Sequence, residues 1–347
     1  LAVGRAVEQL YSDQLSEHAA RLALHFEKGG EAQRAYNYFI LAGKVSLSTY
    51  ANEEAEHQYR SALALASCDA ERVTPLDGQG EALYRQSRFA EALQVWSEGI
   101  RLYQHLGDIN GVAKLYARSA RVAWHNGDTP ECLRLSQEGL TAVTDAPDSP
   151  EIALLIHEAA RAYLFNGQPD EALPLCQQAL EMAERLGAVE VQADALATLG
   201  ILPDLSPEVV LDALKKAIQL AETNGLLRIA GRAHHNMGVM ISGLQGDQKA
   251  ALHHYLQAAE FSLQRGVASE ELFSLVNATE VTLGMGKLSE VEDMLLKLEE
   301  LLKAIADPAP YVLAIDSIKA GLLWMRGEWE KSIRLSRICQ PEARQRG

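Results

Sequence analysis

Hydrophobic positions along the chain recur three and four residues apart, which is the spacing of one face of an α-helix. In a pattern repeated about every 40 residues, a small residue is usually followed by a larger one four positions later and by another small one three positions after that. The first residues of the seven copies, which we call anchors, are Ala92, Cys132, Ala172, Val210, Ala251, Val291 and Ser332. They are separated by 40, 40, 38, 41, 40 and 41 residues. An interval this regular predicts tandem structural repeats.

Glycines keep the same register and mark the ends of the predicted helices. One column lies five residues before an anchor: Gly127, Gly167, Gly246, Gly286 and Gly327. A second column lies fifteen residues after an anchor: Gly107, Gly187, Gly225, Gly266 and Gly347. Because glycine readily adopts the left-handed backbone conformation that closes a helix, the two columns predict two turns in each repeat.

We therefore predict an all-α fold, a right-handed superhelical solenoid of antiparallel helix pairs. One pair cannot cover its own apolar faces, so stability comes from stacking each pair on its neighbours. Residues 71–347 are expected to form seven such repeats. Residues 1–70 are expected to form a separate helical segment, because its two anchor-like patterns, at Ala35 and Ala55, are only 20 residues apart. A polar stretch with a proline, residues 67–75, is expected to link the two.

The repeat pattern resembles the tetratricopeptide repeat. Its clearest copy runs from Asn236, Met237 and Gly238 through Gly246 and Asp247 to Ala251, Tyr255 and Ala258. At about 40 residues, the unit is about six residues longer than the 34-residue form of that family, so we expect longer helices. The resemblance implies that the first helix of each pair lines a concave groove.

Counting back seven, eight or eleven positions from the anchors identifies the side chains expected in this groove. The partner-binding residues predicted by this count are Glu81, Tyr84, Arg85, Arg121, Trp124, His125, Arg161, Phe165, Glu280 and Trp324, and His235, which lies outside the count, is expected to join the same surface. Aromatic rings offer large contact area, and arginines offer donors for carboxylate or phosphate. The alternative interpretation is that Trp124 and Trp324 pack between helices.

The N-terminal segment is similar to the stretch that follows the ATPase module in bacterial multidomain regulators. The similarity rests on four runs: GRAVEQLY at 4–11, EHAARLALHFE at 17–27, AYNYF at 35–39 and YANEEA at 50–55. The group comprises MalT-like, LuxR-type transcription factors and adenylate-cyclase or kinase fusions. The resemblance implies an upstream ATPase domain in the full-length protein, with the repeats as a sensor and oligomerisation arm. The absence of an initiator Met agrees with a piece of a longer chain.

Composition narrows the classes of partner and of chemistry. The formal net charge of −15 argues against direct binding to nucleic acid. The chain has no apolar run of membrane-spanning length. The four cysteines, far apart in sequence, are Cys68, Cys132, Cys176 and Cys339. This spacing matches neither a disulfide framework nor a zinc motif, and it predicts a cytoplasmic protein. The sequence contains no nucleotide-binding glycine motif, so we expect no cofactor, no catalytic residues and no enzyme activity.

Two histidine pairs are the strongest candidates for a metal site, His234 with His235 and His253 with His254. Adjacent residues on a helix point about 100° apart, so each pair offers one ligand in a given direction. No carboxylate or cysteine stands beside them at ligand spacing. We therefore predict no metal ligands among them.

These observations predict a non-enzymatic regulatory interaction module, the sensor or scaffold arm of a multidomain bacterial signalling ATPase or transcription regulator. Its expected partner is a protein, a peptide or a small effector bound in the concave groove, and self-association is left open. The alternative is a stand-alone protein–protein scaffold without a ligand switch. The identity of the adjoining domain would separate the two.

Overall fold

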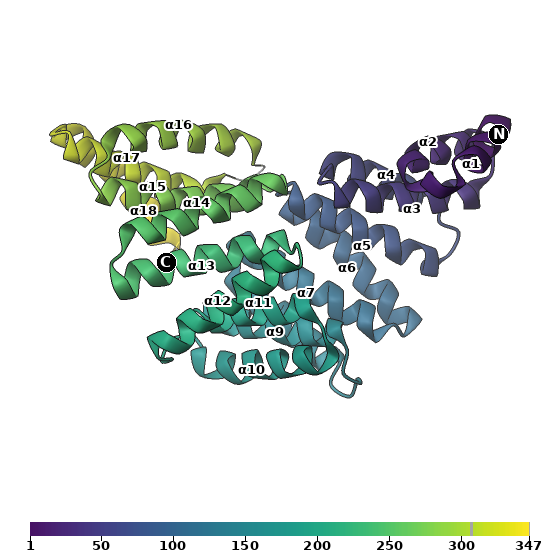
Figure 1. Cartoon of the computed structure of the whole chain (residues 1–347), viewed down its shortest axis with the longest axis horizontal. Coiled ribbons are helices and arrows are strands. Elements are labelled where there is room, and N and C mark those ends of the chain that lie inside the picture. Colours follow the sequence, from purple (N-terminus) through teal and green to yellow (C-terminus); the bar gives the residue numbers. More distant parts are fainter. Residues whose placement is uncertain (306–307, 347) are drawn as a thin grey trace. The chain divides into compact units, whose positions relative to one another are not determined.

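The computed structural model describes residues 1–305 and 308–346, with side chains described except at 310 and 338–346. Within these residues every regular element is a helix, and no strand occurs (Figure 1). The chain divides into two compact units, Leu1–Gly167 and Gln168–Gly347. The predicted all-α class is confirmed. None of the described helices is both long enough and apolar enough to span a membrane.

The helices of the first unit have the following bounds: α1 Ala2–Leu10, α2 Leu15–Lys28, α3 Ala32–Ser48, α4 Asn52–Leu65, α5 Asp69–Arg85, α6 Phe89–Leu106, α7 Ile109–His125, α8 Thr129–Ala142 and α9 Pro150–Phe165. A short 3₁₀ turn, Ser12–Gln14, joins α1 to α2. The helices of the second unit are α10 Pro169–Leu186, α11 Val189–Leu199, α12 Pro207–Thr223, α13 Leu227–Gln245, α14 Gln248–Gln264, α15 Ala268–Gly284, α16 Leu288–Ala304, α17 Ala309–Met325 and α18 Trp329–Arg346.

Within each unit, successive helices run back and forth and pack as pairs (Figure 1). In the first unit α5 packs on α6 and α7 on α8, and in the second unit α13 packs on α14 and α17 on α18. First helices of neighbouring pairs also touch, as α7 touches α9, α11 touches α13, and α15 touches α17. Each pair thus covers its neighbour, which is the arrangement predicted from the repeat interval.

All seven anchors are buried, with exposed fractions between 0% and 5%. Short side chains at these positions let two helices approach closely, and the larger residue four positions later fills the space beside them. Trp96, Cys176 and Leu214 are such residues, and all three are buried. Ser336, on the last described helix α18, is exposed instead. The side chain of Cys339 lies outside the described residues.

The turn glycines adopt the predicted left-handed conformation. Both columns have φ between 64° and 78° in the described residues, and Gly347 lies outside them. The turn between α5 and α6 has Ser87 where the first column has glycine. Ser87 takes φ 58°, which shows that the repeat geometry imposes this conformation even on a residue with a side chain.

The N-terminal helices continue the stack. α4 has Ala55 and Tyr59 where later second helices have the anchor and the larger residue, 37 residues before Ala92. The apparent 20-residue spacing arises because Ala35 lies on α3, the first helix of that pair. The expected linker is wrong, since α5 begins at Asp69 and includes Pro75, packed against α4. The predicted boundary at residue 70 falls inside the first unit.

Candidate partner-binding surface

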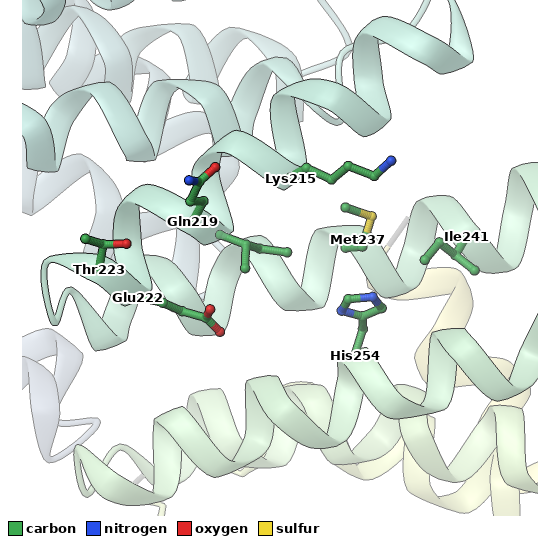
Figure 2. Close-up of a pocket in the computed structure, with 8 residues that line it drawn as sticks. Lys215, Gln219, Glu222, Thr223, Met237, Ile241 and His254 are labelled. Carbon is green, nitrogen blue, oxygen red and sulfur yellow. The ribbon is translucent and has the colours of Figure 1, made fainter.

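An open pocket in the second unit lies among α12, α13 and α14 (Figure 2). Its lining residues are Lys215, Ile218, Gln219, Glu222, Thr223, Met237, Ile241 and His254. None of them is a predicted groove residue.

Four predicted residues of the first unit form a continuous series of rings, which we call the aromatic row: Tyr84, His125, Trp124 and Phe165. The Tyr84 hydroxyl lies 3.2 Å from Nε2 of His125. The ring of His125 meets that of Trp124 edge-on, with centroids 4.8 Å apart. Trp124 in turn stacks on Phe165, again with centroids 4.8 Å apart.

Helix packing explains why these rings meet. Each lies in the last turn or two of a first helix, and α7 lies directly against α9. Phe89, at the start of α6, packs against two members of the row. The centroid of its ring lies 6.2 Å from that of Tyr84 and 6.0 Å from that of His125. Tyr84 is buried, whereas Trp124, His125 and Phe165 are half-buried. The row therefore presents three partly exposed rings on a fixed base.

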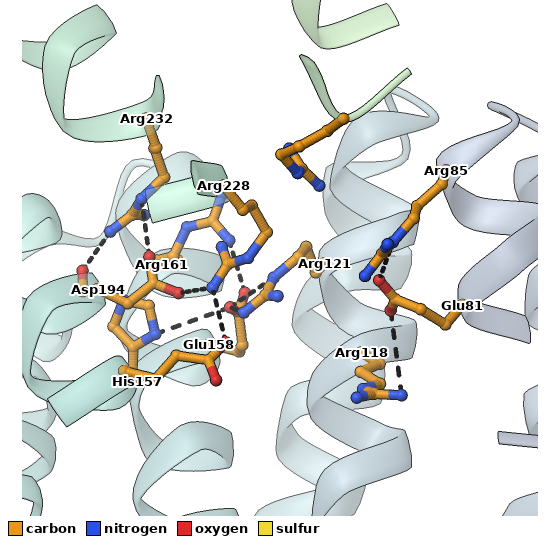
Figure 3. Close-up of polar contacts among 12 residues, drawn as sticks. Glu81, Arg85, Arg118, Arg121, His157, Glu158, Arg161, Asp194, Arg228 and Arg232 are labelled. Atoms are coloured by element: carbon orange, nitrogen blue, oxygen red, sulfur yellow. Dashed lines mark hydrogen bonds and ion pairs between the residues drawn. The ribbon is translucent and has the colours of Figure 1, made fainter. Parts of the chain in front are cut away.

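A buried ionic cluster, whose residues are drawn in Figure 3, contacts the aromatic row through Arg161. Glu158 accepts a hydrogen bond from Nε of Arg121 at 2.9 Å and from Nη1 of Arg161 at 2.6 Å. Nδ1 of His157 lies 3.7 Å from the same carboxylate. All four side chains are buried. A carboxylate between two guanidinium groups satisfies charges that would otherwise be costly to bury.

Arg161 connects this cluster to the row. Its guanidinium lies 5.2 Å from the ring centroid of Trp124 and 5.6 Å from that of Phe165, within cation–π range. The side chains of Arg121 and Arg161 thus hold the helices in position within the unit. Their predicted part in ligand binding stays a prediction.

Sequence reasoning missed Glu158. It lies fourteen positions before the anchor Ala172, whereas the predicted groove positions lie seven, eight or eleven before an anchor. A usable signal was present, since Glu158 precedes Arg161 by three residues on the same helix, a spacing that favours an ion pair.

Glu81 and Arg85 form a second, half-buried ionic group on α5 (Figure 3). Nε of Arg85 donates to Glu81 at 2.7 Å, and Nη1 donates to the backbone oxygen of Leu47 at 2.8 Å. Arg118 of α7 lies 4.0 Å from the same carboxylate and also pairs with Asp77. The two predicted residues are therefore brought together as a pair that joins α5 to its neighbours.

The predicted residues of the second unit occupy separate local environments. His235 is buried, with Nδ1 3.1 Å from the Ser274 hydroxyl and its ring stacked on Phe273. Burial lowers the pKa of His235 to about 4, so the imidazole is neutral at pH 7. Glu280 is exposed. Trp324 is 57% exposed, and its ring lies 6.2 Å from that of Trp329.

A buried aspartate that sequence reasoning also missed organises α11 and α13 (Figure 3). Asp194 pairs with Arg228 at 2.5 Å and with Nε of Arg232 at 3.0 Å. Nη2 of Arg232 donates to the Thr198 hydroxyl at 2.8 Å. As in the first unit, a carboxylate on one first helix holds arginines of the stack in place.

The buried cysteines are structural. Burial raises the pKa of the Cys132 and Cys176 thiols to about 12, so both stay protonated at neutral pH. Cys176 donates to the backbone oxygen of Ala195 at 3.4 Å. A protonated, buried thiol is a poor nucleophile, so neither residue is a candidate for catalysis.

Comparison with known proteins agrees with this architecture. Residues 111–202 match the tetratricopeptide repeat family. A Rap protein in complex with Competence and Sporulation Factor has a TM-score of 0.64 at 14% identity, with 95% of this chain and 93% of that chain covered. The fold is that of tetratricopeptide-like helix-pair repeats. No curated protein sequence matches the chain.

Two further solved structures share the tetratricopeptide-like fold. A Signal Transduction ATPase with Numerous Domains from Pyrococcus horikoshii, which has a tetratricopeptide repeat sensor, gives a TM-score of 0.54 at 12% identity and 95% coverage of this chain. The chain spans about half of that protein, 52% of its length. Aspartyl phosphate phosphatase F from Bacillus subtilis gives a TM-score of 0.53 at 12% identity, with 89% and 84% of the two chains covered.

Proposed function

We propose that the chain is a non-enzymatic regulatory module whose aromatic row binds a protein or peptide partner. The observation that carries this proposal is the set of three half-buried rings, Trp124, His125 and Phe165, two of which lie against the guanidinium of the buried Arg161. Partly exposed aromatic rings are typical anchors of protein interfaces. Rings that are fixed before binding lose less conformational entropy when a partner arrives.

We further propose that the module is the sensor or scaffold arm of a multidomain bacterial signalling ATPase or transcription regulator in the cytoplasm. The fold similarity to an ATPase with a tetratricopeptide repeat sensor supports this context. So does the resemblance of residues 1–70 to the stretch after such ATPase modules. The alternative is a stand-alone scaffold. A gene that encodes an ATPase module next to these repeats would support the arm, and a gene of repeats alone would favour the scaffold.

The binding proposal can be tested with a random peptide library displayed on phage. The chain should enrich a related set of sequences, and fluorescence anisotropy should show saturable binding of the corresponding synthetic peptide. Trp124→Leu should weaken that binding at least tenfold, because a central aromatic anchor commonly contributes 2 kcal/mol or more, as an order of magnitude.

The matched control is Tyr163→Leu, on the same helix as Phe165. Tyr163 faces α8, where its hydroxyl accepts a hydrogen bond from Gln137 at 3.2 Å. This variant should bind the peptide as the parent chain does. Equal loss in both variants, or enrichment of peptides that Trp124→Leu binds normally, would refute the assignment of the aromatic row.

A further inference from the structure

In the second unit, three helices bring two histidines and a glutamate into one chain of contacts. His234 of α13 lies between Glu222 of α12 and His254 of α14. Its Nε2 is 3.0 Å from Oε1 of Glu222, and its Nδ1 is 2.8 Å from Nδ1 of His254. Glu222 and His254 both line the open pocket drawn in Figure 2. His234 is buried, His254 is half-buried and Glu222 is exposed.

The carboxylate determines which nitrogen of His234 has the lone pair. Glu222 accepts a hydrogen bond, so Nε2 of His234 carries the proton and Nδ1 carries the lone pair. That lone pair points at Nδ1 of His254. A histidine that donates one ring N–H to a carboxylate and directs its other nitrogen at a shared point has the arrangement found in metal-binding histidines.

We propose that Nδ1 of His234 and Nδ1 of His254 form a chelating pair for a divalent transition-metal ion, with Glu222 as the positioning residue. Two imidazoles favour zinc, copper or nickel over magnesium or calcium. The open pocket admits the water molecules that complete the coordination. The sequence expectation of no metal ligands took no account of Glu222, which the turn between α12 and α13 brings beside His234.

The geometry requires only a small rearrangement. Metal–nitrogen distances of about 2.1 Å in tetrahedral coordination put two ligand nitrogens about 3.4 Å apart. The two Nδ1 atoms are 2.8 Å apart, so the rings must separate by roughly half an ångström. His254 can move because it lies half-buried at the pocket. When the ion binds, the proton on Nδ1 of His254 passes to Nε2, so each imidazole stays neutral and no net proton is released.

The neighbouring histidine provides a matched control. His253 is exposed, and its ring centroid lies 5.5 Å from that of His254. A site built from His234 and His254 should not depend on it. Adventitious binding to exposed histidines, in contrast, should depend on His253 at least as strongly.

The test is titration of the chelator-treated chain with Zn²⁺ by isothermal calorimetry, alongside thermal unfolding with and without Zn²⁺. We expect one saturable site per chain and a Zn²⁺-dependent rise in Tm. His254→Gln should weaken Zn²⁺ binding at least tenfold and abolish the rise in Tm. Glu222→Gln should weaken binding by about 10- to 100-fold, as outer carboxylate partners of metal ligands commonly do. His253→Gln should change neither.

Because His254 is half-buried and Glu222 is exposed, both variants should fold, which circular dichroism can verify. The proposal is overturned if the parent chain shows no saturable Zn²⁺ binding. It is also overturned if His253→Gln reduces binding as much as His254→Gln does.

Discussion

The rings of Trp124 and Phe165 stack with centroids 4.8 Å apart and planes inclined by 27°, although they belong to successive repeats. Trp124 lies in the last turn of α7 and Phe165 in the last turn of α9, and the guanidinium of Arg161 lies over both rings. The exposed surface of the first unit therefore depends on how two repeats pack. A partner that contacts both rings can bind one packing of α7 against α9 more tightly than another. Such a difference in affinity between two conformations is what a sensor requires.

Replacing Glu158 should destabilise the first unit strongly. In Glu158→Ala, Arg121 and Arg161 would stay buried without the carboxylate between them, and such a loss typically costs about 3–5 kcal/mol. The free energy of unfolding in urea measures the effect. The control is Glu138→Ala, which removes an exposed partner of Arg134 and should cost about 0.5 kcal/mol or less. Similar losses in the two variants would show that the buried cluster does not stabilise the unit.

Two helical glycines should respond in opposite directions to the same substitution. A Cβ at Gly80 would lie 2.2 Å from Nε1 of Trp96, whose indole N–H donates to the backbone oxygen of Asp77. Gly80→Ala should therefore cost roughly 1–3 kcal/mol through overpacking. Gly243 lies within α13, where a Cβ meets open space. Gly243→Ala should stabilise the chain by about 0.5–1 kcal/mol. A Tm that does not fall in Gly80→Ala would contradict the packing around Trp96.

Acid should weaken the second unit partly through His235. Its pKa is about 4 in the folded chain and 6.5 as an ordinary histidine, so the unfolded state takes up the proton first. The free energy of unfolding should therefore fall as pH decreases from about 6.5 to about 4, by roughly 3 kcal/mol from this group, and the decline should level off below that range. His235→Gln should flatten this part of the pH profile, whereas His57→Gln, at an exposed position, should leave it unchanged. A parallel decline in all three proteins would assign the effect to other groups.

The helix pairs could be predicted because the buried anchor positions recur at a regular interval in the sequence. Ala92, Ala172 and Ala251 must be small wherever two helices cross, so their interval reports the repeat directly. The register of residues 1–70 was harder to assign, because α3 and α4 have the same small-aromatic-small pattern. Pro75 suggested a break, yet it is buried within α5, which packs against α4.

Only some of the side chains predicted for the binding surface lie together in the structure, for a physical reason. The aromatic row could be predicted because its residues lie seven or eight positions before an anchor. Rings at these equivalent positions come into contact when neighbouring first helices lie side by side. Arg121 looks the same in sequence whether it faces solvent or a buried acid. At a solvent-facing groove position, Arg121→Glu would weaken binding with little change in the melting temperature. Its burial against Glu158 predicts a large loss of stability instead.

The central claim, that a partner binds the aromatic row, is tested most directly by hydrogen–deuterium exchange of the chain with and without a library-selected peptide. Backbone amides in the last two turns of α7 and α9, residues 118–125 and 158–165, should exchange more slowly when the peptide is bound. Protection confined to the second helices α6, α8 and α10, with α7 and α9 unchanged, would contradict it.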